Sequence, residues 1–245
     1  MKTILLFPLI IINLVSFAQT AINKSVAVQP GQIINMHFDY PDLIRVSTWD
    51  KNEISIQGTV RINGGENDEA FVLDTNTSGN AISITSEIKG VKNLPQRITV
   101  EHAGKKIVFK TKADFQKYCN EHGRDYNSFS TGVDMDIVLE IKVPHNIATR
   151  IESVYGIVEV NKFTGPLVVE ATYGGVDVAL QEKSIGELIA ETNFGQIYSN
   201  LDIKLSGDNI HEKDFNIYVS AKPGNGPRYS FESKYGNVYL RKAIN

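Results

Sequence analysis

One short phrase recurs in the last third of the chain, as IESVYGIV from Ile151, VEATYGGV from Val169, AETNFGQI from Ala190 and FESKYGNV from Phe231. Each copy has a glutamate, two further residues, an aromatic residue, a glycine, one residue and then Val or Ile. The leading glutamates lie 18 residues (170 − 152), 21 residues (191 − 170) and 41 residues (232 − 191) apart. Repeats of this length are typical of solenoids, in which each turn packs on the one before. The phrase therefore predicts a β-solenoid-like repeat region.

The gap of 41 residues (232 − 191) is long enough for one extra turn. The stretch DFNIYVSAKPG, which starts at Asp214, has the apolar alternation expected of a degenerate copy. Within each regular copy, the glycine predicts a tight turn with positive φ between two strands, because a Cβ atom penalises that conformation. The repeat glycines are Gly156, Gly174, Gly195 and Gly236.

The aromatic residues of the copies are expected to stack from turn to turn. Two interpretations stay open, since stacked rings either form a platform that binds sugar rings or stabilise a solenoid corner without any ligand. The candidate binding residues in the copies are Tyr155, Tyr173 and Tyr235. The leading glutamates also allow two interpretations, a row that binds cations or a solvated row interrupted by lysines such as Lys162 and Lys234.

From Ser25 to about Val143, apolar and polar positions alternate, which is the pattern of strands with one buried face. The longest run is VDMDIVLEIKV from Val133 to Val143, and Pro144 ends it. Turn sequences rich in Gly, Pro and Asn separate the shorter runs. We therefore predict an all-β protein, in which an antiparallel, sandwich-like region (19–145) leads into the solenoid-like repeat region (146–245).

One segment departs from this alternation. TKADFQKYCNEH, residues 111–122, spaces Phe115 and Cys119 as a helix would, Thr111 and Asp114 resemble a capping box, and Gly123 follows as a stop. We expect a single short helix inserted between strands, followed by a loop, RDYNSFST. Because binding residues favour loops and insertions on a rigid scaffold, the loop residues Tyr126 and Phe129 are further binding candidates.

The first 18 residues have the pattern of a secretory signal peptide. Lys2 precedes an apolar run from Ile4 to Val15, and Ser16-Phe17-Ala18 has the small residues of a cleavage site. The chain is therefore expected in the periplasm, at the cell surface or outside the cell, with no transmembrane segment after cleavage. Its net charge of −3 argues against a nucleic-acid partner, and the single cysteine, Cys119, permits no internal disulfide.

The common catalytic and cofactor motifs, such as GxSxG, HExxH and the phosphate-binding loop, are missing from the sequence. Cys119 and His122 have the spacing of helical metal ligands, with His102 as a third candidate, but the usual further ligands are missing. Asp134, Asp136 and Glu140 lie on one polar strand face, where acidic residues more often serve solubility than acid–base catalysis. We therefore predict no catalytic residues, no cofactor and no bound metal.

Three further features are the phrase VSTWDKNEISIQG from Val46, the phrase EIKVPHN from Glu140, and the segments FTGPL and GELIAE between the YG copies. Together with the YG copies and the signal peptide, they resemble the putative-adhesin family of secreted bacterial envelope proteins. The resemblance implies a repetitive β-solenoid-like protein without enzymatic residues. The expected function is a non-catalytic cell-envelope protein that adheres to, binds or scaffolds an envelope component, either a glycan or a protein. The alternative is a polysaccharide-acting enzyme on a parallel β-helix.

Overall fold

The structure is a computed structural model that describes residues 19–207 and 215–243. The predicted signal peptide, residues 1–18, lies outside the described residues. Alternating apolar residues form strands as expected: in β2 (Ile33–Phe38), Ile34, Met36 and Phe38 are buried while His37 between them is exposed. The prediction of an all-β protein is confirmed, with two large sheets, one small sheet and a single α-helix among the described residues.

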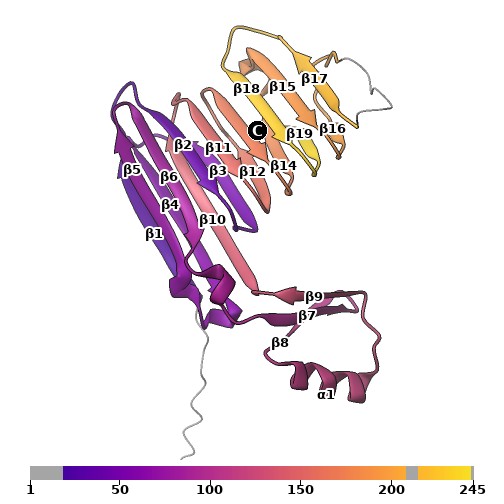
Figure 1. Cartoon of the computed structure of the whole chain (residues 1–245). Coiled ribbons are helices and arrows are strands. Elements are labelled where there is room, and N and C mark those ends of the chain that lie inside the picture. The colour runs from indigo at the N-terminus through magenta and orange to yellow at the C-terminus, as the bar shows by residue number, and fades with distance from the viewer. Residues whose placement is uncertain (1–18, 208–214, 244–245) are drawn as a thin grey trace, which may run out of the picture.

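The two large sheets each contain eight strands and run through the body of the molecule (Figure 1). The first sheet contains, in spatial order, β1 (Thr20–Ala27), β4 (Glu53–Ile62), β10 (Met135–Pro144), β3 (Leu43–Trp49), β12 (Ile157–Asn161), β14 (Val176–Leu180), β19 (Val238–Lys242) and β16 (Ile197–Ser199). The second contains β17 (Ile217–Ala221), β15 (Glu187–Thr192), β18 (Arg228–Ser233), β13 (Leu167–Ala171), β11 (Thr149–Ser153), β2, β6 (Ala81–Ile88) and β5 (Phe71–Ser78). Neither sheet closes on itself.

Each copy of the repeated phrase contributes one strand to each sheet. The first copy forms β11 and β12, the second β13 and β14, the third β15 and β16, and the fourth β18 and β19. Strands from neighbouring copies pair in parallel, and Glu152 lies opposite Glu170, as Glu170 lies opposite Glu232. The phrase thus keeps its register from copy to copy.

The spatial order of the copies differs from the expected order. The fourth copy lies between the second and the third, because β18 pairs with both β13 and β15, and β19 pairs with both β14 and β16. The prediction that each turn packs on the one before is therefore wrong for the third copy, which packs on the fourth and not on the second. The segment proposed as a degenerate turn contributes β17, which pairs antiparallel with β15 and so caps that edge instead of adding a copy.

The N-terminal strands do not form the predicted antiparallel arrangement. Strands β1, β4 and β10 are antiparallel, as are β5 and β6, but β2 pairs in parallel with both β6 and β11. Strand β3 pairs in parallel with β10 and β12. The reason is that β2 and β3 join the same two parallel ladders as the repeat copies. Both sheets therefore contain strands from either side of residue 145, and the predicted division there remains a prediction.

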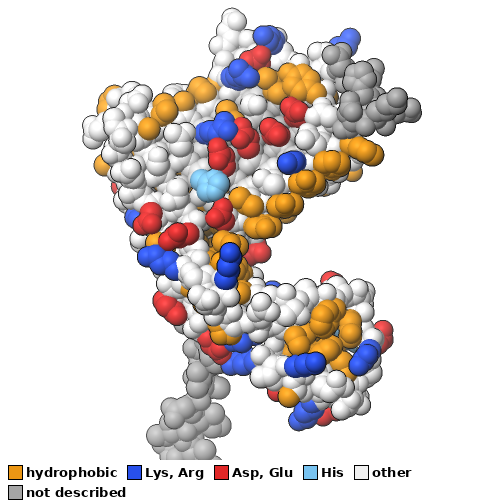
Figure 2. Space-filling model, in the orientation of Figure 1, with side chains coloured by type: hydrophobic (Ala, Val, Ile, Leu, Met, Phe, Trp, Pro, Cys, Tyr) orange, Lys and Arg blue, Asp and Glu red, His pale blue; other side chains and the backbone are white. Residues whose placement is uncertain are grey.

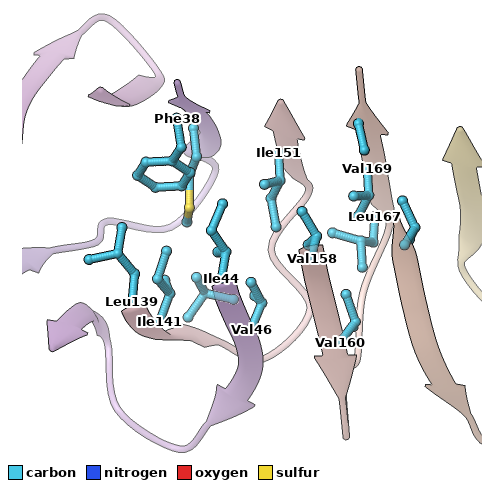
Figure 3. Close-up of a cluster of buried hydrophobic side chains, with 14 of the residues drawn as sticks. Phe38, Ile44, Val46, Leu139, Ile141, Ile151, Val158, Val160, Leu167 and Val169 are labelled. Carbon is cyan, nitrogen blue, oxygen red and sulfur yellow. The ribbon is translucent and has the colours of Figure 1, made fainter. Parts of the chain in front are cut away.

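The hydrophobic core lies between the two large sheets. Ile44, Leu139 and Val158 come from the first sheet, and Ile151 and Val169 come from the second; all five are fully buried. Figure 3 shows these side chains in one cluster. Burial of apolar surface contributes roughly 25 cal/mol per Å². The chain therefore draws its stability from packing along the whole length of the two sheets.

The predicted helix is confirmed as α1 (Lys112–His122), and Thr111 Oγ1 accepts a hydrogen bond of 3.1 Å from the backbone N–H of Asp114. It packs beside a three-stranded antiparallel sheet of β8 (Lys105–Phe109), β7 (Arg97–His102) and β9 (Ser128–Gly132). Residues 97–132 project from the body (Figure 1) and are called the arm below. The predicted loop is partly wrong, because its last four residues belong to β9 and pair with β7.

Short 3-10 helices connect some of the strands: η1 (Asn63–Gly65), η2 (Asp68–Ala70), η3 (Val91–Asn93) and η4 (Glu182–Ser184). Glu66 follows η1 and accepts a hydrogen bond from Arg97 at the base of the arm, with 2.5 Å between Arg97 Nη2 and Glu66 Oε2. Among the described residues, the helices lack the combination of length and apolar character that crossing a membrane requires.

Candidate functional site: an exposed aromatic ladder

Six aromatic side chains stack in one line across the corners between the two sheets. We call them the aromatic ladder: Tyr40, Tyr155, Tyr173, Tyr235, Phe194 and Phe215. The centroids of the three inner pairs are 5.1–5.2 Å apart, and those of the two outer pairs 5.8–6.0 Å apart. Figure 2 shows hydrophobic side chains in such a line across the body.

The backbone at the corners sets the spacing of the ladder. The N–H of Tyr173 donates to the carbonyl oxygen of Val154 (2.9 Å), and the N–H of Tyr235 donates to that of Thr172 (2.9 Å). An equivalent backbone hydrogen bond joins the corner of each copy to the corner of its neighbour in space. The distance between neighbouring rings is therefore close to the distance between neighbouring strands. The ladder therefore follows from the repeated phrase and from the parallel register.

The repeat glycines allow these corners to approach closely. Gly156 has φ +78° and confirms the predicted conformation, but Gly174, Gly195 and Gly236 do not have positive φ. The prediction is wrong for those three, which are needed for another reason. A Cβ atom on Gly174 would lie 1.4 Å from the carbonyl oxygen of Gly156, and one on Gly236 would lie 2.2 Å from that of Gly174.

The ladder is unusually exposed for a set of aromatic side chains. Five of its six rings are exposed, with fractions from 44% for Tyr235 to 66% for Phe215, whereas Tyr40 at one end is half-buried. The planes of the inner pairs differ by 7–13°, so each ring covers the faces of its neighbours. The ladder consequently presents ring edges and tyrosine hydroxyls to solvent, and not the broad ring faces that the sugar-platform interpretation assumed.

Two members of the ladder were missed by sequence reasoning. Tyr40 lies at the corner between β2 and β3, which precedes the first copy in space, and its ring stacks on Tyr155. The sequence signal was weak: Tyr40 follows His37 by three residues, as Tyr155 follows Glu152, but His37 and Pro41 replace the glutamate and the glycine of the phrase. Phe215 extends the other end by stacking on Phe194, and no repeat of the phrase marks it.

The two loop candidates lie elsewhere. Tyr126 and Phe129 pack against Phe115 of α1, with centroids 6.0 and 5.5 Å from its ring. Phe129 is half exposed, while Tyr126 is half buried. The structure therefore brings Tyr155, Tyr173 and Tyr235 together in the ladder and places Tyr126 and Phe129 in a separate aromatic cluster of the arm.

A row of carboxylates runs along the second sheet. Its members are Glu152, Glu170, Glu232 and Glu191, on directly paired positions of four neighbouring strands. Arg150 pairs with both Glu152 and Glu170, and His37 Nδ1 lies 3.1 Å from Glu152 Oε2. Figure 2 shows acidic side chains gathered beside the line of hydrophobic ones. The row is thus partly neutralised at one end.

The two ends of this row differ electrostatically. Hydrogen bonds with Arg150 and then with His37 lower the pKa of the Glu152 carboxyl. Partial burial, and then the charges of Glu191 and Glu170, raise the pKa of the Glu232 carboxyl above its ordinary value of 4.5. Ionised Glu152 therefore stabilises the fold, whereas ionised Glu232 destabilises it.

We expect the two carboxylates to respond oppositely to neutralisation. At neutral pH, Glu232→Gln should raise the melting temperature and Glu152→Gln should lower it, because one change removes repulsion and the other removes an ion pair. The gain from Glu232→Gln should shrink as the pH falls through the raised pKa of Glu232 toward the ordinary value of 4.5, and it should vanish below that value, where the carboxyl is protonated in the folded and the unfolded chain alike. Thermal unfolding followed over this pH range checks both signs, and equal shifts in the same direction would contradict this description.

Each residue considered for catalysis has its own basic partner. Asp136 pairs with Arg61 (3.8 Å) and Glu140 with Arg45 (3.7 Å), and four residues of strand place the two acids about 13 Å apart along the strand. Asp134 is buried and its Oδ1 lies 2.5 Å from Lys106 Nζ. These acids therefore have individual basic partners and do not form one acid–base pair.

The residues considered as metal ligands are also dispersed. Cys119 is buried, the ring of His122 stacks on Tyr118 (4.5 Å), and His102 Nδ1 contacts the carbonyl oxygen of Asp125. Over residues 19–207 and 215–243, no group of three or more His, Cys, Asp and Glu is arranged to hold a metal ion. The absence of a bound metal and of a cofactor stays a prediction.

Comparisons with known proteins define what the chain is similar to. No family model matches it, and no curated protein matches it. Among solved structures it is similar to a putative cell adhesion protein from Clostridium sporogenes, with a TM-score of 0.50 and 12% sequence identity over 92% of this chain and 100% of that chain. A putative adhesin from Bacteroides fragilis aligns with a TM-score of 0.27 and 10% identity, over 91% and 98% of the two chains. The first likeness shows that this all-β chain shares its fold with a protein that carries the name of a cell adhesion protein.

Proposed function

We propose that the protein is an exported, non-catalytic binding protein that holds an extended polymer of the cell envelope along its aromatic ladder. The observation that carries the proposal is the exposure of stacked rings: Tyr155, Tyr173 and Phe194 are 47–57% exposed although each ring is stacked on both sides. An exposed line of aromatic side chains is typical of an interaction surface. Rings that served stability alone would be expected to lie deeper.

The regular spacing supports a polymeric partner. Equivalent side chains recur about every 5.1 Å along the ladder, so a partner with its own repeat makes the same weak contact several times. Linked weak contacts multiply affinity without a single strong pocket. Tyrosine hydroxyls, which both donate and accept hydrogen bonds, suit either a glycan or an extended protein segment.

The scaffold supports the same proposal. We infer that the repeat copies act as turns of a β-solenoid-like body, since neighbouring copies pair in parallel in both sheets. The pattern of residues 1–18 supports export to the envelope or beyond. The likeness to a protein named as a putative cell adhesion protein is consistent with adhesion as the biological role.

The alternative, a polysaccharide-acting enzyme, has less support. Such an enzyme needs two carboxyl groups placed on either side of one glycosidic bond. Asp136 and Glu140 each pair with a separate arginine on the face of the sheet, and Asp134 is buried against Lys106. The non-catalytic interpretation accounts for the exposed ladder, which the enzyme interpretation leaves without a role.

Replacement of two ladder rings tests the proposal. Tyr173→Ala combined with Tyr235→Ala should weaken binding to isolated envelope material at least about tenfold, because tyrosines at the centre of an interface contribute most of the binding energy. The dissociation constant is measured by quantitative co-sedimentation with the envelope material.

A matched control is available in the first sheet, on β16 and β19. Tyr198 and Tyr239 also stack at 5.1 Å, and Tyr198 is 51% exposed, but they lie outside the ladder. Tyr198→Ala combined with Tyr239→Ala should leave the dissociation constant within about twofold of the parent. Equal weakening by both double variants, or no weakening by the ladder variant, would remove the basis for the proposal.

A further inference from the structure

A hollow of about 420 Å³ lies where the aromatic ladder meets the arm. We call it the junction hollow and define it by Tyr40, Tyr155, Thr99, Lys106, Ser130 and Asp134, which line it. Its volume falls within the range of about 300–1,000 Å³ that is typical of small-molecule sites. Figure 2 shows that the line of hydrophobic side chains descends toward the recess between the body and the arm. The hollow is therefore continuous with the ladder.

Polar contacts fix the arm against the body and so preform the hollow. Buried Arg97 pairs with Glu66 (2.5 Å), and Lys110 pairs with the same carboxylate. Asn63 Nδ2 donates to the carbonyl oxygen of Pro95 (2.9 Å). A site that is already formed before binding loses little entropy when a ligand enters.

The small sheet of the arm turns its polar side toward the hollow. Thr99 and Ser130 lie directly opposite each other on β7 and β9, and both line the hollow. The neighbouring pair, Val100 and Phe129, points to the opposite face because side chains alternate along a strand. On that face Phe129 contacts Phe115 of α1. The strand pattern of the arm thus presents hydroxyl groups to the ladder and rings to the helix.

Lys106 and Asp134, two of the three charged side chains that line the hollow, pair with each other. The side chain of Asp134 is only 7% exposed, and its Oδ1 lies 2.5 Å from Lys106 Nζ. Asp42, also on the lining, uses Oδ2 to accept from the backbone N–H of Ile137 (2.8 Å). Paired charges leave oriented hydrogen-bond donors and acceptors with little attraction for an isolated ion. The lining therefore suits an uncharged ligand with many hydroxyl groups.

We propose that the junction hollow binds one sugar unit of a neutral polysaccharide whose chain continues along the aromatic ladder. The sugar packs against the ring edges of Tyr40 and Tyr155, while its hydroxyls hydrogen-bond to Thr99, Ser130 and the Lys106–Asp134 pair. This inference rests on the proposed function, since it specifies the polymer as a glycan. An extended peptide would instead pair with the free edge of β9.

The test uses neutral hexasaccharides as probes: β-1,4-linked glucose, β-1,4-linked N-acetylglucosamine, α-1,4-linked glucose and α-1,6-linked mannose. Each is titrated into the isotope-labelled whole chain while the backbone amide resonances are followed by NMR. We expect at least one probe to give saturable shifts at Thr99 and Ser130. Thr99→Val combined with Ser130→Ala should weaken that binding at least about tenfold, because it removes two hydroxyls that face the sugar.

Ser128→Ala is the matched control, because Ser128 is exposed on the same strand as Ser130 but does not line the hollow. It should leave the dissociation constant unchanged. The inference is overturned if none of the four probes shifts the amides of Thr99 and Ser130, or if unrelated extended peptides shift them instead. Loss of envelope binding in the Tyr173 and Tyr235 double variant, without any sugar response at the hollow, would overturn this inference alone and leave the proposed function standing.

Discussion

Replacement of Gly174 with Val is expected to lower the free energy of unfolding by about 3 kcal/mol or more. The reason is a backbone contact, since a Cβ atom at this position would lie 1.4 Å from the carbonyl oxygen of Gly156 and 2.3 Å from its carbonyl carbon. Neither atom belongs to a side chain that could rotate away, so two neighbouring corners must separate. For a chain of this size the loss corresponds to roughly 6–12 °C in melting temperature, measured by circular dichroism.

Gly132→Ala is the control for the glycine prediction. A Cβ atom at Gly132 would meet no heavy atom within 4 Å, and its φ is not positive. This substitution should change the free energy of unfolding by about 1 kcal/mol or less. Equal melting temperatures for Gly174→Val and the parent would show that the corners do not approach as closely as described.

Replacement of Phe231 with Ala is expected to cost about 3–5 kcal/mol, because the fully buried ring would leave a cavity. Phe231 belongs to the fourth copy and pairs with Val169 of the second copy and Ala190 of the third. Its ring therefore packs in the core at the point where the fourth copy is inserted. Phe194→Ala is the comparison, because its ring is 57% exposed. Phe194 stacks on two rings, and each such contact contributes about 0.5–1.5 kcal/mol, so the substitution should cost less than about 3 kcal/mol and less than Phe231→Ala.

Urea unfolding of the two phenylalanine variants separates the core from the ladder. A large loss for Phe231→Ala with a small loss for Phe194→Ala is the expected pattern. Similar losses for both would mean that the ladder contributes to stability as the core does, and that its exposure is not a sign of binding.

Local patterns in the sequence predicted the strands and the helix well. The alternation in the strand β10 places Ile137, Leu139 and Ile141 in the core as expected. Thr111 caps α1, and Gly123 follows it with φ +75°. Strand alternation and helix capping depend on residues that are close together in the chain, so both can be predicted from short stretches of sequence.

The arrangement of the copies could not be read from the sequence. Each copy carries compatible edges, and the repeated phrase alone does not specify which copy lies beside which. The fourth copy inserts between the second and third, so that Tyr235 stacks between Tyr173 and Phe194. The close approach of the glycine backbones is also a property of neighbouring copies, which is why a local argument from φ was right only for Gly156.

The candidate site was predicted in part. Tyr155, Tyr173 and Tyr235 were identified through the phrase, and the structure aligns them. Tyr40 was hidden because Pro41 occupies the position that glycine has in the copies. The junction hollow depends on the contact between Lys106 and Asp134, which lie in different parts of the fold. Such contacts arise from tertiary structure and leave no periodic signal.

The most direct test of the proposed function measures binding and polymer length in the same sample. The polysaccharide and the protein fractions of the envelope are each incubated with the parent chain and with the Tyr173→Ala and Tyr235→Ala double variant, and the retained and free polymers are sized by chromatography. We predict that the parent retains polymer of unchanged length from at least one fraction and that the double variant retains little. Shortened polymer with the parent, together with loss of that shortening on Asp134→Asn or Asp136→Asn, would contradict a non-catalytic binding protein.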